Sequence, residues 1–176
     1  KLKNYLPKSD IVIAQDFGHN FFSKKIRNLI EKNSKFLSIN VQTNSLNYGF
    51  NIINRKFNKA DMFTLDEKEL ELFSSKNKLN YTLELRNLFK HLKSKHCFLT
   101  CGDKFSLAIN NRKIFKIQNL NENAIDTVGA GDIFHCMSSI LSKLTDNLFL
   151  NLLISQISGA LAVNILGNSE FPKLKE

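Results

Sequence analysis

The sequence predicts an α/β fold built on a mostly parallel sheet. Short runs of consecutive apolar residues alternate along the chain with segments in which Leu, Ile and Phe recur at three- and four-residue spacing. Continuous apolar strands are typical of parallel sheets covered on both faces, and the helix-period segments between them supply the crossovers. The chain has 176 residues, of which 43% are hydrophobic, and this suffices for one domain with a core of its own.

The predicted strands come in two groups. Four are short apolar runs with helical patterns among them: Asp10–Gln15, Phe36–Val41, Ala60–Leu65 and Cys97–Thr100. The remaining two runs, Phe105–Ile109 and Lys113–Ile117, flank Asn110-Asn111-Arg112, which has the composition of a hairpin turn. We therefore expect a parallel sheet that is extended by a hairpin.

Five segments have the periodicity of helices: Phe21–Asn33, Asp66–Ser74, Tyr81–Lys93, Gly129–Leu144 and Asn147–Leu166. The polar stretch Lys76–Asn80 is predicted to be a surface loop. In such folds ligands bind where parallel strands end, often at a helix N-terminus, so the segments after each strand are the first place to look for a site.

Composition excludes several classes of protein. The net charge of +9 comes from 21 lysines and only 4 arginines, and the 22 asparagines beside them indicate the compositional drift of an AT-rich genome. The basic patches Lys90–Lys95 and Lys173–Lys175 are short and lack interleaved arginine and aromatic residues, so we expect no nucleic-acid partner. No apolar run has the length of a membrane helix, and the first ten residues contain no signal-peptide core. We expect a cytoplasmic protein without a membrane partner.

The cysteines Cys97, Cys101 and Cys136 are odd in number and have apolar neighbours, which favours reduced thiols. Together with His96 and His135 they raise the alternative of a metal site. However, residues four apart in a strand lie about 13 Å apart, too far for Cys97 and Cys101 to share one zinc ion. Small buried side chains are the favoured interpretation.

The segment Asp126–Asp132, with sequence Asp-Thr-Val-Gly-Ala-Gly-Asp, is the strongest chemical signal. It directly precedes a helical pattern, so Gly129, Ala130 and Gly131 leave backbone N–H groups exposed at a helix N-terminus, where a phosphate or an oxyanion binds well. Asp132 falls in the first turn of that helix, where its carboxylate could accept a proton from a substrate hydroxyl. A small-molecule kinase needs this combination. A tight turn with an acidic residue near the helix dipole is the purely structural alternative.

This string resembles the D-T-x-G-A-G-D signature of the ribokinase-like, or PfkB, family of carbohydrate kinases. The resemblance implies a ribokinase-like three-layer sandwich and ATP-dependent phosphoryl transfer to a sugar hydroxyl, with Mg²⁺. It also implies that Asp132 is the catalytic base and that Gly129, Ala130 and Gly131 form the anion hole.

Further family motifs imply the nucleotide and metal sites. Thr100-Cys101-Gly102-Asp103 resembles the T-x-G nucleotide loop, although Phe105 stands where relatives often have a second glycine. Asn164 and Gly167 lie in segments that resemble the adenine cover. Asp66-Glu67-Lys68-Glu69 resembles the N-x-x-E motif that places magnesium, with Asp66 replacing the Asn; read alone, these residues equally suit a helix capping box.

Asp126 falls where many relatives hold a monovalent cation such as K⁺, although it could instead fix its own loop. Asp16-Phe17-Gly18-His19-Asn20 resembles the D-Y-x-K-G segment of heptose-phosphate kinases, and amides including Asn44 follow the next strand. Asp16 and Asn44 are therefore predicted to bind the sugar, and a heptose phosphate is the favoured substrate. An asparagine-rich loop without a function is the alternative for the amides.

Family members are longer, and the resemblance places residues 1–176 in the nucleotide-binding and catalytic portion of one kinase domain. The N-terminal strands, the Gly-Gly substrate motif and the β lid would be absent. The chain is then expected to be a C-terminal fragment or a truncated product that needs a partner, either the missing half or a second copy. Two alternatives stay open: a nucleoside or vitamin-precursor kinase of the same fold, and a non-catalytic nucleotide-binding module.

Overall fold

The computed structural model describes residues 1–43, 48–75, 79–120 and 127–164. Within these residues six strands form one sheet whose spatial order follows the sequence: β1 Val12–Asp16, β2 Leu37–Val41, β3 Met62–Asp66, β4 His96–Cys101, β5 Phe105–Asn110 and β6 Ile114–Gln118. Strands β1 to β4 run parallel, while β5 and β6 are antiparallel to their neighbours. The predicted mostly parallel sheet with a terminal hairpin is confirmed.

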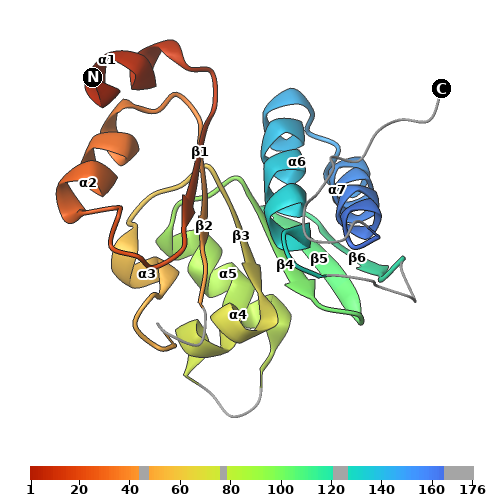
Figure 1. Cartoon of the computed structure of the whole chain (residues 1–176). Helices are drawn as coiled ribbons and strands as arrows, with labels where there is room; N and C mark the ends of the chain where they lie inside the picture. Colours follow the sequence, from red (N-terminus) through yellow and green to blue (C-terminus); the bar gives the residue numbers. More distant parts are fainter. Residues whose placement is uncertain (44–47, 76–78, 121–126, 165–176) are drawn as a thin grey trace.

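Helices cover both faces of the sheet (Figure 1). They are α1 Leu2–Tyr5, the 3-10 turn η1 Leu6–Lys8, α2 Lys24–Asn33, α3 Ile53–Lys56, α4 Glu67–Ser74, α5 Tyr81–His91, α6 Ala130–Leu144 and α7 Leu148–Ala162. Helices α6 and α7 pack against each other and against the sheet, on the face opposite α2, α3 and α5. The result is three layers. No helix among the described residues combines the length and hydropathy needed to cross a bilayer.

Alternation along each strand divides the apolar side chains between two cores. The larger core contains Ile39, Phe63 and Leu99 from the sheet, together with Phe57 and Leu88 from the covering segments. A fully buried side chain of this size stabilises the fold by about 2 kcal/mol.

The smaller core, beneath α6 and α7, contains Met62 and Phe98 of the sheet and Phe134 and Leu152 of the helices. The rings of Phe98 and Phe134 meet edge to face, with their centroids 6.2 Å apart. This contact fixes the N-terminal half of α6 against the centre of the sheet.

Several predicted boundaries were wrong for local reasons. Helix α2 begins at Lys24 rather than Phe21, because the hydroxyl of Ser23 accepts from the amide of Ile26 and caps the helix. Helix α5 ends at His91, because Lys93 has a φ of 54° that no helix accommodates. The first strand starts at Val12 instead of Asp10, and α7 ends at Ala162. Helices α1 and α3 and the turn η1 were not predicted, since four residues or fewer show no periodicity.

Candidate functional site

The carboxyl ends of β2, β3 and β4 meet the N-terminus of α6 around a cavity of about 220 Å³. Its lining is mainly polar and includes Asn40, Thr64, Asp66, Glu69, Thr100 and Asp132. The parallel strands place these side chains together, because their carboxyl ends lie at one edge of the sheet. A second cavity of about 600 Å³ adjoins the first and shares Asp66, Thr100 and Gly131 with it. The site thus has a small polar compartment and a larger outer cleft.

The turn before α6 brings backbone N–H groups to the boundary between the two cavities. Gly129 is the N-cap with a φ of 83°, a conformation that favours glycine, and no side chain caps the helix. A Cβ on Gly131 would meet no atom within 4 Å, and no positive φ requires glycine there. Gly131 therefore leaves an open space beside the first-turn amides, and this space fits an anionic ligand.

Asp132 lies in the first turn of α6 and is half-buried at the wall of the polar cavity. Its Oδ1 accepts hydrogen bonds from the side-chain amides of Gln42, at 2.5 Å, and Gln15, at 3.1 Å. Burial raises the pKa of this carboxyl, while the bond from Gln42 opposes the rise. The carboxylate lies in the first turn of α6 beside the Gly129–Gly131 turn, as the sequence predicted, but the two glutamines that hold it were not anticipated.

Asp66 and Glu69 face the polar cavity from the start of α4 and form a reciprocal capping box. The amide of Glu69 donates to Asp66 Oδ1 at 2.8 Å, and the amide of Asp66 donates to Glu69 Oε2 at 2.9 Å. Glu69 Oε1 also accepts from the amide of Thr43 at 3.0 Å. Burial, and then the charge of Asp66, raise the pKa of Glu69 to about 8. The capping role of the motif is thus present, and both carboxyl groups also line the cavity.

A buried polar network orients Asn40 toward the same cavity. Asn40 Nδ2 donates to the hydroxyl and the carbonyl of Thr64, and the hydroxyl of Thr64 lies 2.9 Å from Nδ1 of His135. Nε2 of His135 lies 3.4 Å from the hydroxyl of Ser38. Asn40 Oδ1 is buried without a hydrogen-bond partner in the described part of the chain.

These groups fit a hydrated Mg²⁺ ion. Magnesium prefers oxygen ligands and retains several waters, and the cavity offers the carboxyl groups of Asp66 and Glu69. No cluster of three or more His, Cys, Asp or Glu side chains suited to a metal is found among the described residues. The cysteine–histidine metal site is accordingly absent there, and Cys97 and Cys101 are buried in β4.

The outer cleft is lined by two of the residues predicted to bind the nucleotide. Thr100 and Gly102 line it at the turn from β4 to β5, and Ala160 and Val163 of the last helical segment lie opposite. Gly102 has a φ of 55°, and the amide of Lys104 closes the turn by donating to Cys101 O at 3.0 Å. Asn164 is described but does not line the cleft. Gly167 lies outside the described residues.

Glu67 and Phe105 anchor the same turn from its outer side. Lys104 Nζ lies 3.0 Å from Oε2 of Glu67. The other carboxylate oxygen, Oε1, accepts from the hydroxyl of Tyr81. The ring of Tyr81 meets Phe105 edge to face. Phe105, at the place of the family's second glycine, therefore starts β5 and packs on the covering helix.

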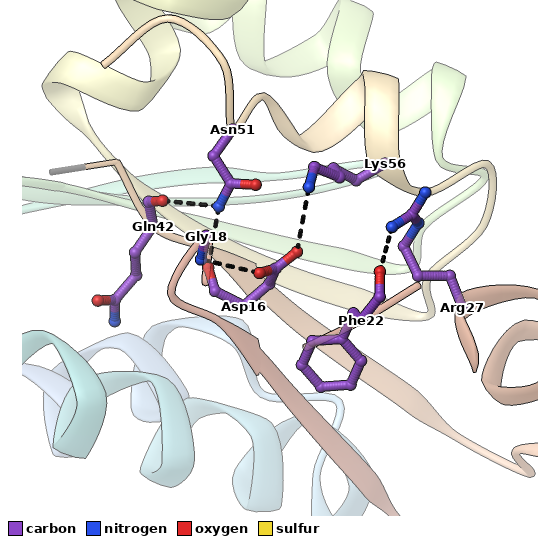
Figure 2. Close-up of polar contacts among 7 residues, drawn as sticks. All are labelled: Asp16, Gly18, Phe22, Arg27, Gln42, Asn51 and Lys56. Carbon is purple, nitrogen blue, oxygen red and sulfur yellow. Dashed lines mark hydrogen bonds and ion pairs between the residues drawn. The ribbon is translucent and has the colours of Figure 1, made fainter. Parts of the chain in front are cut away.

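Asp16 lies beside Gly18 and Lys56 (Figure 2). It has the strand parity of Ala14, which packs in the larger core, so its side chain points to the face of the sheet opposite α6. It is 2% exposed, and its carboxylate accepts from the amide of Gly18 at 2.9 Å and lies 3.9 Å from Nζ of Lys56. It does not line the polar cavity. Asn44 and Asp126 lie outside the described residues.

Comparison with known proteins gives the class of protein. The model of the pfkB family of carbohydrate kinases matches residues 19–151. The chain therefore belongs to this family. No curated protein matches the chain.

Solved structures share the ribokinase-like fold. Ribokinase of Thermotoga maritima is 22% identical with a TM-score of 0.74 over 94% of this chain. Ribokinase of Arabidopsis thaliana, solved with ribose and ATP, is 17% identical with a TM-score of 0.74 over 94%. Phosphofructokinase-2 of Escherichia coli, solved with potassium, is 12% identical with a TM-score of 0.77 over 97%. The chain spans only about half of each, namely 54%, 53% and 57%.

Proposed function

We propose that the protein transfers the γ-phosphoryl group of ATP to a hydroxyl of a sugar or sugar phosphate. The observation that carries this proposal is the position of the Asp132 carboxylate on the wall of the polar cavity, beside Gly131, which also lines the larger outer cleft. A phosphotransferase needs a base that accepts the proton of the acceptor hydroxyl and hydrogen-bond donors for the transferring phosphoryl group. It also needs room for the nucleotide next to these groups.

In the proposed reaction Asp132 accepts the proton of the acceptor hydroxyl. The acceptor oxygen forms a bond to the γ-phosphorus while the bond to the leaving ADP oxygen breaks. The N–H groups of the turn Gly129–Gly131 and of Asp132 donate to the oxygens of the transferring group, whose charge they stabilise in a partly water-excluded site. The chain contributes positioning and charge stabilisation, which are the main requirements of this chemistry.

Mg²⁺ would be held by Glu69 and Asp66, which line the polar cavity. When bound, this ion neutralises charge on the nucleotide phosphates. Thr100 and Gly102 would contact the nucleotide in the outer cleft. The proposal of a monovalent cation at Asp126 rests on the family resemblance and on the potassium in phosphofructokinase-2 of E. coli.

The favoured acceptor is a phosphorylated sugar such as a heptose phosphate, on the strength of the segment Asp16–Asn20. Since Asp16 does not line the polar cavity, this segment would shape the sugar site through its backbone and neighbouring residues. The sugar half that solved relatives possess would come from chain beyond these residues or from a partner subunit.

The test is a screen of acceptor alcohols with the full-length gene product, using release of ADP as the readout. Sugar phosphates, free sugars, nucleosides and hydroxymethyl vitamin precursors form the panel, and ATP without an acceptor is the blank. Acceptor-dependent ADP release with a sugar or sugar phosphate is expected. Release with a nucleoside alone would reassign the acceptor. ATP binding without release for any acceptor would instead indicate a nucleotide-binding module.

A further inference from the structure

Two glutamine side chains converge on one oxygen of Asp132. Gln15 lies near the end of β1, and Gln42 directly follows β2. They are 117 and 90 residues from Asp132 in the sequence. Both donate through Nε2 to the same Oδ1. The orientation of each amide follows from chemistry, because its carbonyl oxygen would repel the carboxylate.

This convergence leaves the second carboxylate oxygen for the cavity. Hydrogen bonds to an ionised acceptor are stronger than those between neutral groups, so two donors on Oδ1 fix the side-chain torsions of Asp132. No hydrogen bond joins Oδ2 to another described residue, and the carboxylate lines the polar cavity. The oxygen without an amide donor is thus the one free to accept a proton.

The backbone of Gln42 is itself held rigidly (Figure 2). Its amide donates to the carbonyl of Asp16 at 2.9 Å. Asn51, which is only 3% exposed, donates through Nδ2 to the carbonyls of both Gln42, at 2.8 Å, and Asp16, at 3.1 Å. This bridge ties the ends of β1 and β2 together at the level from which Gln15 and Gln42 extend.

The side chain of Asp16 is also held by contacts at the ends of these strands. Its carboxylate accepts from the amide of Gly18 and lies near Nζ of Lys56, as Figure 2 shows. Contacts thus link Lys56 to Asp16, and Asn51 to the backbone beside both glutamines. These buried contacts fix the backbone, while the glutamine side chains, which are only partly buried, reach across to α6.

We propose that Gln42 and Gln15 are positioning residues that hold Asp132 in one rotamer, with Oδ1 occupied and Oδ2 presented to the acceptor hydroxyl. The catalytic consequence rests on the proposed function, but the hydrogen-bonded arrangement does not. Because the glutamines act through their amide N–H donors, a side chain of the same size without a donor should not replace them.

The experiment compares Gln42→Met, which removes the donor, with Gln42→Glu, which replaces it by an acceptor. Gln15→Met is a second, independent variant, and Gln118→Met is the matched control, since Gln118 is exposed at the end of β6 and lines neither cavity. In the full-length gene product, kcat, the KM for ATP and their pH dependence are measured. The ¹³C resonance of the Asp132 carboxyl is titrated in parallel, with Asp132→Asn for its assignment.

Gln42→Met is expected to lower kcat by about 10- to 100-fold with little change in the KM for ATP. Loss of a donor raises the pKa of the carboxyl it served, so the acidic limb of the rate profile should move to higher pH, and further for Gln42→Glu. The other titratable groups near Asp132 are Cys136 on α6 and Asp66 and Glu69 across the cavity. They are the same in every variant.

Equal losses of kcat at all pH values in both Gln42 variants, with an unchanged ¹³C titration of Asp132, would overturn the proposal and leave the glutamines a structural role. The proposed function can fail separately. If the wild-type protein transfers no phosphoryl group, the ¹³C titration still decides, because the order wild type, Gln42→Met, Gln42→Glu in rising Asp132 pKa requires only the hydrogen bonds.

Discussion

The buried imidazole of His135 leads to a quantitative prediction for the pH dependence of stability. The side chain is 0% exposed, and within the described parts of the chain its ring nitrogens lie near the hydroxyls of Thr64 and Ser38. Burial lowers the pKa of His135 from its ordinary 6.5 to about 3. The folded protein therefore keeps the ring neutral at pH values where the unfolded chain takes up a proton.

The free energy of unfolding must consequently fall as the pH drops below 6.5, until the folded state also binds the proton near pH 3. Between pH 7 and pH 5 this single group removes about 2 kcal/mol. Any folded-state pKa below about 4 gives the same figure, because the unfolded chain alone titrates over that interval.

Urea unfolding at pH 7 and pH 5, followed by circular dichroism, measures the effect. His135→Gln should be less stable than the wild type at pH 7, where it loses well-formed hydrogen bonds, but should lose about 2 kcal/mol less than the wild type between pH 7 and pH 5. The exposed His91→Gln is the matched control and should keep the wild-type loss. Equal losses in the wild type and His135→Gln would refute a neutral, buried His135 and with it the network that orients Asn40.

Three further predictions concern the walls of the outer cleft. Gly131→Ala should leave the free energy of unfolding unchanged or raise it by up to about 1 kcal/mol in thermal unfolding, because α6 has room for the Cβ. The same change should reduce ADP release at least about tenfold, because the methyl group fills the space proposed for the anion. A loss of stability would contradict the open space beside Gly131. Gly102→Ala should cost about 1–2 kcal/mol in urea unfolding, since its φ of 55° is strained for alanine although no atom obstructs the Cβ. The hydrogen bond from the Tyr81 hydroxyl to Glu67 is the main cause that raises the pKa of Tyr81 to about 12. Glu67→Gln should therefore move the ultraviolet titration of the Tyr81 phenolate to lower pH. An unchanged titration of Tyr81 would show that this hydrogen bond is not formed.

Local sequence patterns were sufficient for most of the fold. Apolar runs and helical periodicity identify the strands and the long helices, and the glycine-rich string before α6 correctly places Asp132 in the first turn of a helix. These features depend on interactions within a few residues. The short α3 depends instead on buried contacts such as Ile53 with the core, and no local pattern marks it.

The surroundings of the candidate base depend on long-range contacts. Gln15 and Gln42 reach Asp132 only because β1 and β2 pair in parallel and the first turn of α6 lies near their carboxyl ends, and nothing local to a glutamine indicates this. One signal was available, however. Asp16 has the same strand parity as Val12 and Ala14, which pack in the larger core, so alternation alone places Gln15, and not Asp16, on the face of α6.

The most direct test of the account is the kinetics of Asp132→Asn in the full-length gene product, with an acceptor identified by the ADP-release screen. Asparagine keeps the size of the side chain but cannot take a proton. The account predicts that kcat falls by about 10²- to 10⁴-fold, while the Kd for ATP, measured by calorimetry, stays at its wild-type value. Turnover near the wild-type rate would contradict the assignment of Asp132 as the base.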